Sequence, residues 1–325
     1  MNVDKNRISR RNFLKGLGVG SAAVLLPAGN AAASGQSEEL CTLLDLSKCV
    51  GCGECVAACG EANGAKYPEP RKPFPVMHPV SRAKVEDWSD RRDVDDRLTP
   101  YNWLYIQSAE VEYNGETHEI NIPRRCLHCR NAPCANLCPW GAAAKQENGI
   151  VRIFDNVCLG GAKCRSVCPW HIPQRQTGVG LYLRLLPNFA GNGVMYKCDR
   201  CYNRIADGKI PACIEACPEN VQSIGPRSEI LARAHELAEK NNWFIYGEEE
   251  NGGTNTIYVS PVPFDLLDKA VDKGPGRPGL GTVPDSMADE EKLAYAAGVA
   301  PFAGVAAALI KAGNYLSSAG RKDNE

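Results

Sequence analysis

The sequence predicts an α+β fold, with a loop-rich body of two pseudo-symmetric modules followed by a single C-terminal transmembrane helix. Three observations lead to this expectation. The 325-residue chain contains 16 cysteines and 22 prolines, short strand patterns lie between the cysteines, and an uncharged stretch lies near the C-terminus. So many cysteines and prolines are typical of a body rich in loops, in which bound groups fill much of the interior.

Fifteen of the cysteines fall into four groups of similar spacing. Group one reads C-x2-C-x2-C-x3-C and group two reads C-x2-C-x4-C-x3-C. Group three keeps the spacing of group one, except that Gly161 stands where the second cysteine belongs. Groups two, three and four each end in a proline. In chain order the groups are Cys49, Cys52, Cys55 and Cys59; Cys126, Cys129, Cys134 and Cys138; Cys158, Cys164 and Cys168; and Cys198, Cys201, Cys213 and Cys217.

This spacing is typical of iron–sulfur clusters, in which three thiolates of one loop wrap a cluster and the fourth binds a neighbouring cluster. Four groups therefore predict four clusters in two cross-linked pairs. Structural zinc uses paired C-x2-C or Cys/His sets without the trailing proline, and disulfides here would close very small loops. Both alternatives are disfavoured. Cys41 lies outside the groups, and we expect a buried apolar residue at the start of the first strand.

The N-terminus has the pattern of an export signal. Residues 9–15 read SRRNFLK, an apolar stretch runs from Leu14 to Pro27, and Ala31-Ala32-Ala33 offers a cleavage site before Ser34. Residues 1–33 are therefore predicted to be a signal peptide of the twin-arginine type. Clusters are assembled in the cytoplasm, so the protein has to cross the membrane already folded. The alternative is a basic N-terminal helix that is retained as an anchor.

The C-terminal region predicts a membrane anchor at 293–312 and a cytoplasmic tail at 313–325. Residues 293–310 carry no charge, which is just long enough to span the hydrocarbon core. Acidic residues precede this stretch and basic residues follow it, which places the tail in the cytoplasm and the body on the other side. A soluble, alanine-rich helix that lies on a partner is the alternative. Residues 273–292, rich in glycine and proline at their start, are expected to be a linker.

The body at 34–272 is expected to contain several short elements. Asn-Gly turns predict hairpins, and an apolar face repeating every three or four residues predicts a helix. The expected elements are a long loop at 66–100, a hairpin of 101–113 with 117–122, a hairpin of 142–146 with 150–154, a helix at 229–240 capped by Ser228, and a strand at 254–260.

The hairpin at 142–154 lies between groups two and three, which end in the repeated strings Cys138-Pro139-Trp140 and Cys168-Pro169-Trp170. A cysteine loop, a short helix, a hairpin and a second loop make a two-cluster unit, so groups two and three are expected to form an inner module at 123–175. Groups one and four then pair around it as an outer module. Trp140 and Trp170 are expected to pack against a cluster.

Composition and motifs exclude several functions. A net charge of −1 gives no reason to expect nucleic-acid binding. The sequence has neither a glycine-rich dinucleotide fingerprint nor a P-loop, so no catalytic residue is assigned and the chain is not expected to be an enzyme on its own. Two alternatives remain: a self-contained reductase acting at an open iron beside Gly161, and a structural scaffold whose clusters cannot be reduced.

Together, the cysteine groups, the export signal and the anchor resemble the four-cluster ferredoxin subunits of bacterial respiratory enzymes. They are most similar to the iron–sulfur subunits of hydrogenase-2-type complexes, also in the strings RCLHC at 125–129 and KCDRC at 197–201. The resemblance implies electron relay between a periplasmic catalytic subunit, hydrogenase-like, and a quinone-reactive membrane subunit, at the periplasmic face of the inner membrane. Related subunits serve formate dehydrogenases and thiosulfate, polysulfide or tetrathionate reductases, so a molybdopterin catalytic partner is the alternative.

The resemblance also implies which cysteines share a cluster. Three sets have four ligands each and are expected to hold [4Fe–4S] clusters. The fourth set has three ligands, because Gly161 takes the place of a cysteine, and a [3Fe–4S] cluster is favoured there. Water or another side chain on a fourth iron is the next alternative, and Cys41 a distant third. The sets are site 1, Cys49, Cys52, Cys55 and Cys217; site 2, Cys59, Cys198, Cys201 and Cys213; site 3, Cys126, Cys129, Cys134 and Cys168; and site 4, Cys138, Cys158 and Cys164.

Overall fold

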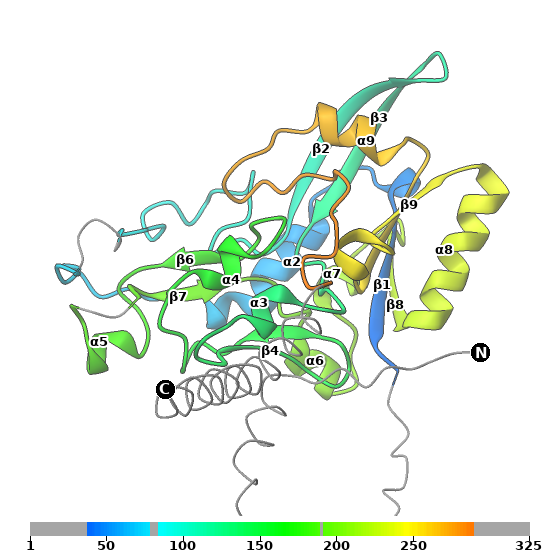
Figure 1. Ribbon diagram of the computed structural model, residues 1–325. Coiled ribbons are helices and arrows are strands. Elements are labelled where there is room, and N and C mark those ends of the chain that lie inside the picture. The colour runs from blue at the N-terminus through cyan, green and yellow to red at the C-terminus, as the bar shows by residue number, and fades with distance from the viewer. Residues whose placement is uncertain (1–37, 79–83, 189–190, 289–325) are drawn as a thin grey trace, which may run out of the picture. The chain divides into compact units, whose positions relative to one another are not determined.

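The computed structural model describes residues 38–78, 84–188 and 191–288 (Figure 1). The chain divides into two units, and residues 28–286 form the unit that contains the cysteines. The predicted signal peptide, anchor and cytoplasmic tail lie outside the described residues. Within the described ranges, no helix combines the length and the apolar character needed to cross a membrane.

A four-stranded sheet supports one side of the body, in the order β8-β1-β10-β9. β1 and β10 are central and parallel, with Thr42 opposite Thr256, and the two outer pairings are antiparallel. Their sequences, LCTLLD and TIYVS, are apolar on both faces, as expected of strands that are covered on both sides. The strands are β1 (Leu40–Asp45), β8 (Gln222–Pro226), β9 (Phe244–Tyr246) and β10 (Thr256–Ser260).

Helix α8 (Arg227–Asn241) covers one face of this sheet (Figure 1). Its Ile230 and Ala234 are buried against Cys41 and its neighbours, which confirms both the predicted apolar face and the expected burial of Cys41. The predicted cap is wrong. The helix begins two residues earlier because Pro226 supplies the extended N-cap, and the amide of Ser228 instead donates to the Glu38 carboxylate at 2.6 Å.

Two hairpins lie where the Asn-Gly turns predict them. β2 (Tyr105–Tyr113) pairs with β3 (Glu116–Arg124), and β4 (Ala143–Lys145) pairs with β5 (Val151–Ile153). In the first turn Asn114 and Gly115 both have positive φ, 53° and 82°, the conformation that favours this dipeptide in tight hairpins. β2 begins later than predicted, because the backbones of Thr99 and Asn102 bond to each other in a preceding turn. β10 also begins later, because the Thr254 hydroxyl accepts from the amide of Thr256 and turns the chain there.

The remaining elements are short, and they include both buried and surface segments. A third small hairpin, β6 (Gln174–Gln176) with β7 (Val194–Tyr196), was not predicted. The helices are α2 (Glu54–Asn63), α3 (Pro133–Asn136), α4 (Lys163–Ser166), α5 (Tyr182–Leu185), α6 (Tyr202–Ala206), α7 (Ala212–Glu215) and α9 (Phe264–Ala270), with the 3₁₀ turns η1 (Leu46–Lys48), η2 (Gly64–Lys66) and η3 (Glu250–Gly252). Within the described part of 66–100, residues 67–78 and 84–100 contain no helix or strand, as predicted.

Residues 273–286, which we call the strap, lie at the start of the predicted linker and are hydrogen-bonded to the body. Arg124, fully buried, donates to the carbonyl oxygens of Pro278 and Gly279 at 3.3 and 2.6 Å. The Asp268 carboxylate accepts from the amides of Leu280 and Gly281 at 2.6 and 2.9 Å. Glycine and proline therefore mark an extended segment that is held by side chains of the body, not a spacer.

Replacing Arg124 with glutamine is expected to release the strap. The two strap carbonyls lose a charged donor, and a lost hydrogen bond of that kind costs roughly 1.5–3 kcal/mol. Limited digestion with trypsin should then cut after Lys273 faster than in the wild type. As a control, Lys269→Gln removes only an exposed ion pair with Asp265 and should leave the cleavage rate unchanged. Equal resistance of the Arg124→Gln protein would contradict this account of the strap.

Candidate iron–sulfur centres

The four cysteine loops share a left-handed residue at one position and a helix start at another. The residue before the second cysteine position has positive φ in every loop: Gly51 at 71°, His128 at 50°, Gly160 at 67° and Arg200 at 55°. The third cysteine of each group, Cys55, Cys134, Cys164 or Cys213, is the second residue of a helix. His128 and Arg200 adopt the conformation without being glycine, which costs of order 1–3 kcal/mol each and is typical of a functional site.

Gly161 occupies the position of a second cysteine in structure as well as in sequence. It is followed by Ala162 with φ of 54°, as Cys52 is followed by Gly53 with φ of 80°. Gly161 is exposed, and no heavy atom of the described residues lies within 4 Å of where its Cβ would be. The group-three loop therefore has the backbone conformation found around Cys52, but it has no thiol at the second position.

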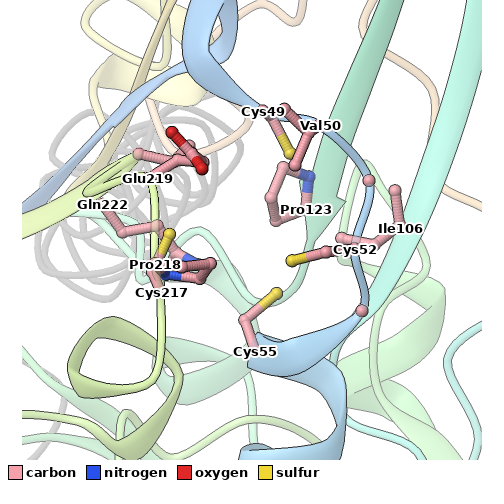
Figure 2. A pocket seen from close by; sticks show the side chains of 13 residues that line it. Cys49, Val50, Cys52, Cys55, Ile106, Pro123, Cys217, Pro218, Glu219 and Gln222 are labelled. Carbon is pink, nitrogen blue, oxygen red and sulfur yellow. The ribbon is translucent and has the colours of Figure 1, made fainter.

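The site 1 cysteines line one pocket of about 310 Å³. Cys49, Cys52 and Cys55 come from the loop before α2 and from the first turn of α2. Cys217 comes from the segment just after α7. Figure 2 shows the four sulfur atoms directed toward the same space. Cys52 and Val50 are exposed, so this pocket lies at the protein surface.

The site 2 cysteines line a second pocket, of about 350 Å³. Cys59, from α2, lies there with three group-four cysteines, so the structure brings together the four cysteines expected for site 2. The Asn63 amide lies 3.7 Å from the Cys59 sulfur and 3.8 Å from the Cys201 sulfur. Arg125 donates from Nη1 to the Cys213 sulfur at 3.1 Å.

The site 3 cysteines line a third pocket, of about 340 Å³. Trp170 also lines it and donates from Nε1 to the Tyr246 hydroxyl at 2.8 Å, so its predicted packing role is confirmed. The same expectation for Trp140 is wrong, because this side chain is 63% exposed. Tyr246 of β9 covers Trp170, whereas Trp140 lies on a turn at the surface.

The site 4 cysteines are also neighbours. Burial raises the pKa of Cys164 to about 12, and the nearby sulfurs of Cys158 and Cys138 act in the same direction. Burial likewise raises the pKa of Cys55 at site 1 to about 12. A buried thiolate is unfavourable unless a positive charge compensates it, and the iron of a cluster supplies that charge.

The residues around the pockets fit an anionic sulfur-containing group. Nη2 of Arg125, at the site 2 pocket, is buried and has no hydrogen-bond partner among the described residues. Lys197 lines the site 3 pocket. Burial lowers the pKa of Lys197, but the surrounding cysteines outweigh burial and the net shift is upward. In the described part of the chain, no three His, Cys, Asp or Glu side chains are placed to share a single metal ion.

Cys41 and the two loop histidines have no place in the pockets that the structure shows. Cys41 is buried under α8 on the far face of β1, away from the site 4 cysteines. His128 is buried, and its Nδ1 accepts from the Val151 amide at 3.0 Å. His171 is exposed, and its Nδ1 lies 3.1 Å from the Arg165 carbonyl oxygen. His128 is therefore a packing residue and His171 a surface residue.

The four sites form an unbroken series. Cys55 and Cys59, one turn apart on α2, line the site 1 and site 2 pockets, and Lys197, which lines the site 3 pocket, directly precedes Cys198 of site 2. Cys164 of site 4 in turn neighbours Cys168 of site 3. The order along this series is therefore 1, 2, 3, 4, although the chain visits the sites in a nested order.

Comparisons with known proteins identify iron–sulfur domains in this chain. Residues 48–142 and 118–227 each match the 4Fe-4S dicluster domain family, and residues 7–27 match the signal sequence of the twin-arginine translocation pathway. The chain is 30% identical over 196 residues to the probable anaerobic dimethyl sulfoxide reductase chain YnfG of Escherichia coli K12, covering 60% of this chain and 77% of the relative. The chain belongs to the ferredoxin-type iron–sulfur subunits of respiratory oxidoreductases.

Two further relatives support this membership. The hydrogenase-2 operon protein HybA of Escherichia coli O157:H7 is 27% identical over 304 residues, covering 80% of this chain and 83% of HybA. A Nitratidesulfovibrio vulgaris protein is 30% identical over 268 residues, covering 79% of this chain, which spans only 65% of that relative's length. The expectations of a non-catalytic electron-transfer subunit and of twin-arginine export are confirmed.

Sequence reasoning missed three side chains of this iron–sulfur subunit that approach the cysteine sulfurs. Asn63 and Arg125 lie within hydrogen-bond distance of sulfur at site 2, and Lys197 lies between sites 2 and 3. Arg125 and Lys197 are the first residues of the strings RCLHC and KCDRC. They were used there only as marks of resemblance, since spacing gives no role to a residue that precedes a ligand.

Proposed function

We propose that this subunit carries electrons through four clusters, [4Fe–4S] at sites 1, 2 and 3 and [3Fe–4S] at site 4, between a catalytic and a quinone-reactive subunit. Clusters of this kind supply one-electron carriers. The observation that carries the proposal is that three pockets are each lined by one complete set of four cysteines.

The chain's own residues hold the clusters and exclude water from most of the path. Cys134, Cys198 and Cys213 are buried, and Leu127 and Trp170 are buried beside them. The outer positions differ, since Cys52 at site 1 and Gly161 at site 4 are exposed. The series of sites therefore reaches the surface at both ends, which suits a relay that receives an electron at one end and gives it up at the other.

The identity of the catalytic partner is part of the proposal. A hydrogenase-like partner is favoured, because HybA is named for a hydrogenase-2 operon and this chain covers 83% of it. A molybdopterin enzyme is the alternative, supported by the relative named as a dimethyl sulfoxide reductase chain. Isolating the complex under mild detergent and identifying its largest subunit by mass spectrometry distinguishes the two.

A second candidate function is a self-contained reductase acting at site 4, which the exposure of Gly161 favours. An open iron there would be accessible to a small substrate. The purified subunit, reduced and separated from its partners, would then turn over a substrate, whereas a relay gives up only the electrons that it holds. Reoxidation limited to one electron per cluster supports the relay.

The purified full-length subunit is expected to carry about 15 irons, in three four-iron clusters and one three-iron cluster. When oxidised it should show the EPR signal of a [3Fe–4S] cluster. Iron analysis per chain and EPR at low temperature measure both quantities. A content of about 16 irons without that signal would contradict the assignment of site 4 and leave the other three sites standing.

The anchor at 293–312 is also proposed, on the uncharged stretch of 293–310. Deleting residues 292–325 is expected to release a soluble protein that keeps all its iron, because the ligands lie between residues 49 and 217. It should still take electrons from the catalytic partner and lose quinone-linked turnover. Membrane fractionation and quinone reduction assays measure these effects. A truncated protein that stays in the membrane and turns over quinone normally would overturn the anchor.

A further inference from the structure

Three cationic side chains are buried among the cysteines: Arg125, Lys197 and Arg200. Arg200 serves the scaffold, because its guanidinium donates to the Leu40 and Asn255 carbonyl oxygens, each at 2.6 Å, and to the Thr256 hydroxyl at 2.9 Å. Its hydrogen bonds tie a cysteine loop to the sheet. Arg200 also lines the site 2 pocket, and its charge acts on Cys198 and Cys126. Arg125 and Lys197 differ from it in their contacts, since Nη1 of Arg125 donates to a cysteine sulfur and Lys197 lines the site 3 pocket.

Arg125 lies between sites 1 and 2. Its Nη1 donates to the Cys213 sulfur at 3.1 Å and also to the side-chain oxygen of Gln222, a residue that lines the site 1 pocket. Its charge acts on Cys198 of site 2 and on Cys55 of site 1. Nη2 has no partner among the described residues and lies at the site 2 pocket.

Lys197 lies between sites 2 and 3. Its Nζ donates to the carbonyl oxygens of Val151 and Cys198 at 2.5 and 3.1 Å, which hold the ammonium in place. Its charge faces Cys126 and Cys134 of site 3 and Cys198 of site 2. The nearby carboxylate of Asp199 is instead paired with Lys66, at 2.8 Å.

A buried cation changes how readily a neighbouring cluster takes an electron. Reduction adds one negative charge to the cluster, and inside a protein this charge interacts strongly with fixed charges close by. A cation therefore stabilises the reduced state and raises the reduction potential, in the same way as hydrogen bonds to the sulfurs do. Arg125 acts by both routes at site 2, and Lys197 acts mainly by charge.

We propose that Arg125 and Lys197 set the reduction potentials along the relay, each raising the potentials of the two clusters between which it lies. Site 2 faces both cations and receives both contributions. The proposal rests on the cluster positions proposed above. It assigns to these residues a tuning role in electron transfer, distinct from ligation.

The test uses the full chain in the complex with which it purifies, with Arg125→Gln and Lys197→Gln. Redox titration followed by EPR measures the potential of each cluster. Each substitution is expected to lower the reduction equilibrium constants of two clusters roughly tenfold or more, which is about 59 mV for one electron. One cluster, that of site 2, should respond to both substitutions, and in the double variant it should shift by about the sum of the two.

Matched controls separate charge from structure. Arg125→Lys and Lys197→Arg keep the charge, so each should shift the potentials clearly less than the matching Gln variant. Lys197→Arg should leave them within about twofold in equilibrium constant, whereas Arg125→Lys should retain only the contribution of charge at site 2, because it loses the guanidinium bond to Cys213. Arg124→Gln removes an equally buried guanidinium one residue away, which binds strap carbonyls in place of sulfur. It should loosen the strap and leave the potentials nearly unchanged. Iron analysis per chain and the EPR line shape confirm that each variant contains its clusters.

Each outcome decides the proposal. Loaded Gln variants whose potentials do not move would overturn it, and so would shifts of equal size in Arg124→Gln. If the Gln variants take up no iron, Gln222→Glu decides instead, because it places a carboxylate against the Arg125 guanidinium and should lower the potentials at sites 1 and 2. Unchanged potentials in that loaded variant would overturn the role of Arg125. A wild-type protein without clusters would overturn the proposed function instead.

Discussion

Replacing Gly161 with cysteine is expected to turn the three-iron cluster proposed for site 4 into a four-iron cluster. The loop already has the ligand-presenting conformation, with positive φ at Gly160 and Ala162. A Cβ at Gly161 meets no heavy atom of the described residues within 4 Å, so the new side chain fits without displacing a neighbour. Iron content should rise by about one per chain. The oxidised variant should no longer show the [3Fe–4S] EPR signal of the wild type, and the reduction potential of this site should change with the cluster type.

Gly161→Ala is the matched control, because it adds the Cβ and withholds the thiol. It should keep the [3Fe–4S] signal and the iron content of the wild type. A Gly161→Cys protein that retains the three-iron signal at full strength would show that the vacancy does not determine the cluster type. Quinone-linked turnover measured on the same samples would then report whether the relay tolerates a different carrier at its outermost position.

Replacing both Arg10 and Arg11 with lysine is expected to keep the protein on the cytoplasmic side. Residues 7–27 match a twin-arginine signal, and this route accepts folded proteins, whereas a cluster-loaded body cannot be threaded as an extended chain. We expect the periplasmic amount to fall about tenfold or more. Cell fractionation followed by immunoblotting measures the distribution.

Arg7→Lys provides the control for that experiment, since it makes the same chemical change in the signal while keeping the arginine pair. Export at the wild-type level is expected for this variant. Normal export of the Arg10→Lys, Arg11→Lys protein would mean that the chain crosses the membrane by another route. The cysteines would then have to acquire their metal after transport.

The sequence predicted well those features that depend on local chemistry. The Asn-Gly pairs at 114–115 and 148–149 predicted both hairpins, because this dipeptide tolerates positive φ at both positions. The apolar positions of α8 predicted its buried face. The cysteine spacing, through the resemblance, predicted the sets that the structure gathers into three pockets.

Features that depend on distant partners could not be predicted in this way. Glycine and proline in the strap indicated a linker, and only the fold brings Arg124 and Asp268 against its backbone. Trp140 and Trp170 occupy equivalent positions in the repeat, yet only Trp170 has Tyr246 beside it. β6 and β7 have three residues each, too few for an alternating pattern to be recognised.

The central position of β1 has a consequence for the order in which the protein matures. This first strand, at 40–45, is bonded on one side to 222–226 and on the other to 256–260, so its neighbours are synthesised only after all four cysteine groups. Contacts this distant in sequence form slowly, because a long loop must close first. Groups two and three, in contrast, are complete by residue 168. With the cluster positions proposed above, sites 3 and 4 have all their ligands by residue 168, whereas site 1 is complete only at Cys217 and the sheet only at residue 260.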